Sequence, residues 1–110
     1  MAIKINPVGV EYAKELLLSG KWALNTQWKT NEPSVEAVEA YRAQHGDEAL
    51  SRWFLATDAD TGYRFAIGDF RKVHHSGVKA ARRYGELNGV PELVDAADEV
   101  LELFDRMNAC

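Results

Sequence analysis

Residues 69–104 read DFRKVHHSGVKAARRYGELNGVPELVDAADEVLELF, and this stretch decides the fold. Asp69 is a residue type that caps helices, Gly89 is a natural helix stop, and Pro91 fits the first position of a new helix. The pattern predicts one helix from Phe70 to about Leu87 and another that begins at Pro91. Because only a short link joins them, the two helices are expected to form an antiparallel αα-hairpin.

Both predicted helices have a narrow face of apolar or small residues. At about 100° per residue, one line of the first helix holds six residues within about 40°: Phe70, Val73, Gly77, Ala80, Ala81 and Tyr84. The second helix has a similar line with Val94 and Val100 beside it: Leu93, Ala97, Leu101, Phe104 and Asn108. The small residues in the first line predict close approach of another backbone.

Two further helices are predicted upstream. Asn6 and Pro7 are a cap and a first helical residue for a helix from Pro7 to Ser19. Pro33 and Ser34 open a second helix, with Ser34 as its cap, which ends at Gly46. Between these helices, residues 21–33 have no clear period and are expected to form a loop anchored in the core by Trp22 and Trp28.

A β-hairpin is predicted in the middle of the chain. Residues 52–57 and 63–67 are rich in aromatic and branched side chains, and the turn-forming residues 58–62 separate them. The alternative is that residues 48–55 continue as helix, because Leu50, Trp53 and Phe54 would share one helical face.

The sequence therefore predicts one small α+β domain spanning residues 1–110, mainly helical, with about four helices, one β-hairpin and a C-terminal αα-hairpin. Its length of 110 residues is enough for a single core without disulfide or metal support. The expected core comprises Leu16, Leu17, Trp53, Phe65, Phe70, Val73, Gly77, Ala81, Leu93, Ala97, Leu101 and Phe104.

Composition narrows the class of protein. With 13 Lys and Arg against 17 Asp and Glu, the net charge is −4. The chain therefore lacks the overall positive charge that is usual in nucleic-acid-binding domains. The single cysteine, Cys110, cannot form an internal disulfide, which is typical of a reducing compartment. No apolar run is long enough to span a bilayer and no signal-peptide pattern is seen, so a cytoplasmic protein without membrane contact is expected.

Charge is distributed unevenly between the two predicted C-terminal helices. The first carries five cationic residues and one anionic residue over 70–88, whereas the second carries six anionic residues and one cationic residue. The outward face of the first helix is predicted to be basic, and its residues are the candidate site for a protein partner or for phosphate: Arg71, Lys72, His75, Lys79, Arg82 and Arg83. An ordinary solvated face explains the same pattern.

The sequence has no strong catalytic or cofactor motif. Neighbouring His74 and His75 diverge on a helix, so neither a metal site nor nucleophilic catalysis by Ser76 is expected, although a metal-dependent enzyme using Asp69, His74 and His45 is a minor hypothesis. The acidic turn with Asp58, Asp60, Gly62 and Asp69 departs from the calcium-loop pattern. No cofactor and no enzymatic activity are expected.

The chain also resembles a group of small uncharacterised prokaryotic proteins through the segment GDFRKVHHSG at residues 68–77. The resemblance extends to the pairs Ala80–Ala81 and Ala96–Ala97 and to an upstream Trp53, and the last forty residues are weakly similar to a helical module of phage head-maturation proteins. The chain differs from the group in a shorter hairpin bridge and in having His75 where arginine is commoner. The resemblance implies a shared fold and no activity, and it points to residues 68–74 as a place for a partner.

These observations predict a non-enzymatic interaction module that binds a protein partner or itself. The alternative is nucleic-acid binding through the basic face of the third helix, at about residues 70–88. The two hypotheses differ in their response to salt, because phosphate binding weakens steeply as salt is added.

Overall fold

The computed structural model of the chain describes residues 3–59 and 62–108. Its elements, in chain order, are β1 (Ile3–Ile5), α1 (Pro7–Leu18), β2 (Trp22–Ala23), α2 (Trp28–Asn31), α3 (Val35–His45), α4 (Asp47–Ser51), β3 (Phe54–Asp58), β4 (Gly62–Ala66), β5 (Val73–His74), α5 (His75–Asn88) and α6 (Pro91–Met107). The α+β class and the mainly helical content are confirmed. In the described residues, no helix is long and apolar enough to cross a membrane.

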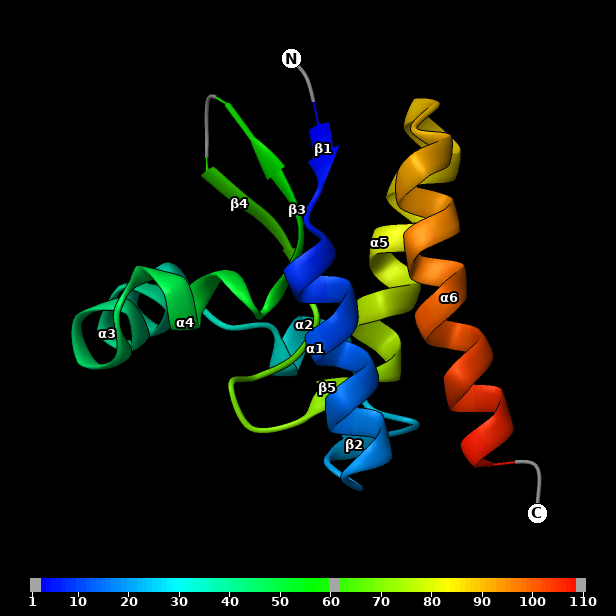
Figure 1. Cartoon of the computed structure of the whole chain (residues 1–110), viewed down its shortest axis with the longest axis horizontal. Helices are drawn as coiled ribbons and strands as arrows, with labels where there is room; N and C mark the ends of the chain where they lie inside the picture. The colour runs from blue at the N-terminus through cyan, green and yellow to red at the C-terminus, as the bar shows by residue number, and fades with distance from the viewer. Residues whose placement is uncertain (1–2, 60–61, 109–110) are drawn as a thin grey trace.

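The strands form two small sheets (Figure 1). The predicted hairpin is present as antiparallel β3 and β4, and β1 extends it on the other side of β3 in the order β1-β3-β4. A second, parallel pair joins β2 to β5, with Trp22 opposite Val73 and Ala23 opposite His74. This second pair was not predicted, and it brings the segment after β2 to the start of α5.

Helix α1 packs directly on the hairpin. A Cβ atom at Gly9 would lie 1.7 Å from the carbonyl oxygen of Phe54, so only glycine allows this approach. The predicted cap Asn6 has a different side-chain role: its amide donates to the carbonyl oxygens of Ser51 (2.8 Å) and Phe54 (3.0 Å), and its side chain accepts no hydrogen bond from α1. Asn6 therefore joins the start of α1 to the entry of β3.

The region around α3 and α4 lies at the side of the molecule away from α6 (Figure 1). Ser34 caps α3 as predicted, because its hydroxyl accepts from the backbone N–H of Ala37 at 3.1 Å. The helical alternative for residues 48–55 is partly correct, since α4 takes residues 47–51 before the chain extends as β3. Residues 21–33 contain β2 and the short α2 and are therefore not simply a loop.

The C-terminal αα-hairpin is confirmed, but its first helix begins at His75 and not at Phe70. Asp69 caps a turn instead of a helix: its Oδ1 accepts from the backbone N–H groups of Arg71 (3.1 Å) and Lys72 (3.0 Å). Phe70 has a φ of 68°, which is incompatible with a right-handed helix. Strand β5 then takes up Val73 and His74 before α5 begins.

The core lies between α1, the sheet and the αα-hairpin. Most of its predicted members are buried, whereas Phe65, Phe70 and Leu101 are only half-buried. On α5 the buried residues are Gly77, Val78, Ala81 and Gly85, and Ala80 is exposed. The buried face of α5 is therefore rotated by about 50° from the predicted apolar line, toward Val78. The reason is that α2, β4 and β5 pack against α5 as well as α6.

Candidate functional site

A groove runs along the outer side of the αα-hairpin. Its volume is about 460 Å³, and among residues 3–59 and 62–108 those that line it all belong to α5 or α6: His75, Lys79, Ala80, Arg82, Arg83, Glu86, Leu101 and Asp105. We call this the α5–α6 groove. It contains four of the six residues that the sequence predicted for a binding surface: His75, Lys79, Arg82 and Arg83.

The cationic side chains of the groove are not equivalent. Arg82 donates from Nε to Asp98 of α6 and pairs through Nη1 with Glu86 at 2.9 Å, and the hydrogen bond to Asp98 is the largest cause of its raised pKa. Lys79 and Arg83 are exposed. Because Arg82 already shares its charge with two carboxylates, the groove does not present the continuous basic stripe that the sequence predicted.

His75 lies at one end of the groove. Its ring packs edge-on against Phe104, with the centroids 5.0 Å apart. Burial, and then the nearby charge of Lys79, lower the pKa of His75 below its usual value of 6.5, and Asp105 opposes them with a smaller effect. The lowered pKa favours the neutral imidazole, so His75 contributes mainly ring surface to the groove.

Arg71 and Lys72 do not belong to this groove, which corrects the sequence prediction. Both are exposed on the turn that follows Asp69, outside α5, and neither lines the groove. The six predicted residues therefore divide into a helical set of four and a turn set of two. The prediction placed them on one face because it assumed that the helix begins at Phe70.

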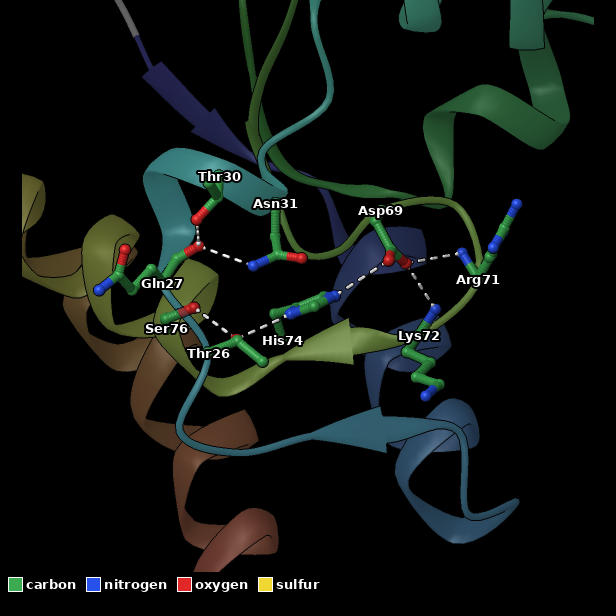
Figure 2. Close-up of polar contacts among 9 residues, drawn as sticks. All are labelled: Thr26, Gln27, Thr30, Asn31, Asp69, Arg71, Lys72, His74 and Ser76. Carbon is green, nitrogen blue, oxygen red and sulfur yellow. Dashed lines mark hydrogen bonds and ion pairs between the residues drawn. The ribbon is translucent and has the colours of Figure 1, made fainter.

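A second polar cluster lies where β5 meets α5 (Figure 2). His74 is 3% exposed; its Nδ1 lies 2.9 Å from the hydroxyl of Thr26, and that hydroxyl lies 3.1 Å from the hydroxyl of Ser76. On its other side, Nε2 lies 3.2 Å from Oδ2 of Asp69, in a contact that is not aligned as a hydrogen bond. We call these four residues the Thr26–His74 cluster.

The carboxyl group of Asp69 is set to remain ionised. Burial is the largest single influence and raises its pKa, but the backbone N–H of Lys72, the ring of His74 and the backbone N–H of Arg71 together outweigh it. The resulting pKa is below the usual 3.8. Asp69 thus holds the 69–72 turn and one side of the buried imidazole at the same time.

The order carboxylate, imidazole, hydroxyl is the order of a nucleophilic triad, but the surroundings favour a structural role. The Thr26 hydroxyl is engaged by both His74 and Ser76, and the ring of Trp28 lies 6.0 Å from that of His74. The same indole fills the space above Gly77, where a Cβ atom would be 2.8 Å from it. The cluster therefore fastens the segment after β2 to α5. Sequence reasoning missed it because Thr26 and His74 are 48 positions apart.

The hypothesised metal and calcium sites are not assembled in the part of the chain that the structure describes. No group of three or more His, Cys, Asp or Glu side chains suited to a metal is present there. His45 instead packs against Tyr41, with the ring centroids 4.4 Å apart, and Asp58 pairs with Arg64 at 3.1 Å inside the hairpin. Asp60 of the proposed calcium loop lies outside the described residues.

Comparisons of the chain with protein-family models, with curated proteins and with solved structures found no match. The resemblance to the prokaryotic group described above therefore stays a prediction.

Proposed function

We propose that this protein is a non-enzymatic interaction module that binds a protein helix in the α5–α6 groove. The observation that carries the proposal is the composition of the groove. Its lining combines two apolar residues, the exposed Ala80 and the half-buried Leu101, with cationic side chains of α5 and the anionic Asp105 of α6. Apolar residues together with charged ones are the usual composition of a protein-binding surface.

A helix is the element that fits such a groove. Ridges of one helix pack into the grooves of another at interaxial distances of about 8–10 Å, and the shortest distances need small residues at the contact. Ala80 provides a small side chain in the middle of α5, and Lys79 and Arg83 beside it can pair with acidic residues of the incoming helix. An amphipathic helix with acidic edges is therefore the expected ligand.

Nucleic acid fits the groove less well. Phosphate binding depends on cationic side chains that are free to displace counterions. In the groove, Arg82 is already paired, and Glu86 and Asp105 repel phosphate. The alternative is that nucleic acid binds through Lys79 and Arg83, together with Arg71 and Lys72 from the turn.

The test uses a labelled peptide with the sequence of residues 91–107, which is an acidic amphipathic helix of the expected kind. Fluorescence anisotropy should show binding to the wild-type protein and to Lys72→Glu, whose charge change lies outside the groove. Binding should be lost in Ala80→Trp, because the indole fills the groove.

Three results would contradict the proposal. The first is the absence of peptide binding together with the absence of self-association, and the second is peptide binding that Ala80→Trp leaves unchanged. The third is tight binding of a single-stranded or double-stranded oligonucleotide that falls steeply with salt and is lost in Lys79→Glu/Arg83→Glu, which would establish the nucleic-acid alternative.

A further inference from the structure

We infer that the helix pair occupying the α5–α6 groove is that of a second copy of this chain, related by a two-fold axis so that α5 of each copy lies against α6 of the other. This inference rests on the proposed function and names its partner.

The two sides of the groove carry opposite charge. On α5, three cationic residues outnumber Glu86, whereas α6 has six carboxylates and only Arg106 as a cation. Four of these carboxylates recur at spacings of three and four: Asp95, Asp98, Glu102 and Asp105. Two of them face α5, since Asp98 pairs with Arg82 and Asp105 lines the groove, whereas Glu102 lies beside Lys14 and Glu99 on another side of α6.

A second copy satisfies both sides at once. A lone acidic helix can pair with Lys79 and Arg83 but not with Asp105 of α6, and a basic helix can do the reverse. A two-fold arrangement sets the basic edge of each copy against the acidic edge of the other, and an isologous interface of this kind requires only one self-complementary surface. The charge pattern therefore favours self-association over a single foreign helix.

Two further apolar residues share helix faces with Ala80 and Leu101 of the groove lining, although Leu87 and Val94 do not line the groove themselves. Leu87 lies seven positions after Ala80, so both are on one face of α5, and Leu87 is 72% exposed. On α6, Val94 and Leu101 are also seven positions apart and are half-buried. Such a repeat of seven is the pattern by which antiparallel helices pack in four-helix bundles. A second copy would cover the side chain of Leu87, which is exposed in a single copy.

The hairpin is long enough for this packing. Helix α5 has 14 residues and α6 has 17. At about 1.5 Å per residue they extend roughly 21 and 25 Å, which is comparable to the helices of small bundles. The interface would use both helices over most of their length and would leave α3 and α4 on the opposite side of the molecule free.

The decisive experiment mixes two charge-reversed variants, with Cys110→Ser in every protein to prevent oxidative crosslinking. Light scattering after size exclusion should give a dimer mass for the parent protein. Lys79→Glu and Asp105→Lys should each weaken the dimer about a hundredfold, because each reverses two symmetry-related contacts at about tenfold per contact. An equimolar mixture should recover a heterodimer, in which both contacts again join opposite charges.

The mixture distinguishes contacts between copies from contacts within one copy. Each variant keeps the like charges that its substitution creates within its own chain, so only contacts between copies can restore the dimer. Circular dichroism of both variants checks that the helices are retained. A second pair tests the apolar contacts: Leu87→Ser should weaken the dimer at least tenfold, whereas Leu18→Ser should not. Leu18 is a matched control because it is 68% exposed but lies on α1, outside the groove.

The outcomes distinguish this inference from the proposed function. A parent protein that stays monomeric at high concentration while it binds the 91–107 peptide would overturn the second copy and leave the interaction module standing. A monomer that binds no peptide would overturn both. A dimer that is insensitive to the charge reversals and to Leu87→Ser would place the self-association elsewhere and overturn the inference.

Discussion

The two faces of α5 use small residues in opposite ways. On one face, the segment after β2 lies against the helix: Trp28 contacts Gly77, and Thr26 bonds to Ser76. On the other face, Ala80 is exposed in the α5–α6 groove. A small residue on a helix thus indicates that another group approaches closely, but it does not identify that group. At Gly77 the approaching group belongs to the same chain, whereas at Ala80 we propose that it belongs to another.

The largest expected effect is at the covered face. Gly77→Val should lower the free energy of unfolding by about 3 kcal/mol, because overpacking a filled site typically costs about 1–3 kcal/mol and the new side chain is larger than the Cβ that already meets the Trp28 ring at 2.8 Å. Urea unfolding followed by circular dichroism measures this. Introducing valine on the open face, as Ala80→Val, should lower the free energy of unfolding by about 0.5 kcal/mol or less.

A double-mutant cycle sharpens this first prediction. If contact with the indole is the cause, Gly77→Val should cost much less in a Trp28→Ala background than in the parent protein. Equal costs in the two backgrounds would show that the glycine is required for some other reason.

The next effect is at the Thr26–His74 cluster, which belongs to the same covered face. Thr26→Val keeps the shape of the side chain but removes the hydroxyl that meets His74 and Ser76, so it should destabilise the protein by about 1–2 kcal/mol. Thr26→Ser is the control, since it retains the hydroxyl. A Thr26→Val protein with the same thermal midpoint as the parent protein would show that the hydroxyl does not contribute to stability.

A smaller effect on stability is expected from Ala80→Trp. The residue is exposed and its face is open, so the unfolding free energy of the monomer should change by roughly 0.5 kcal/mol or less. Unfolding should be measured at low protein concentration, where self-association does not contribute. Ala80→Trp should therefore have a large effect on binding and a small effect on folding, whereas Gly77→Val should have a large effect on folding. A strongly destabilised Ala80→Trp would mean that the groove is closed within the chain.

The smallest effect concerns His75 at the end of the groove. Burial, and then Lys79, lower its pKa in the folded protein, against the weaker opposing influence of Asp105. The unfolded chain therefore binds a proton more readily than the folded one, and stability that is fully present above pH 6.5 should decrease as the pH falls through the folded pKa. His75→Gln should remove part of this decrease. Thermal unfolding between pH 7.5 and 5 measures the difference, and parallel curves for the two proteins would contradict it.

Local sequence patterns predicted much of the hairpin correctly. Pro91 begins α6, Gly89 ends α5 with a φ of 68°, and Ser34 caps α3, because each depends on backbone chemistry within a few residues. The start of α5 was predicted five residues too early. Asp69 has the right chemistry for a helix cap, but it stabilises a turn of similar local geometry, and pairing of β5 with β2 then extends the chain.

The candidate site was predicted in part for the same reason. Spacing alone places Lys79, Arg82 and Arg83 on the outward side of α5, and in the structure these three residues line the groove. Spacing could not show that Arg82 pairs with Asp98 across the hairpin, nor that Arg71 and Lys72 lie on a turn. The Thr26–His74 cluster was missed entirely, since it joins residues that only the β2–β5 pairing brings together.

By itself, the amino-acid sequence determined the α+β class, the two C-terminal helices, their opposite charges and fewer than half of the buried apolar residues. These features follow from apolar periodicity, caps and breakers, which act over one or two helical turns. Tertiary structure alone decided which side of α5 is covered, because that depends on where a distant segment with Trp28 and Thr26 returns to the helix. The open side, with Ala80 and its charged edges, is what that choice leaves for a partner.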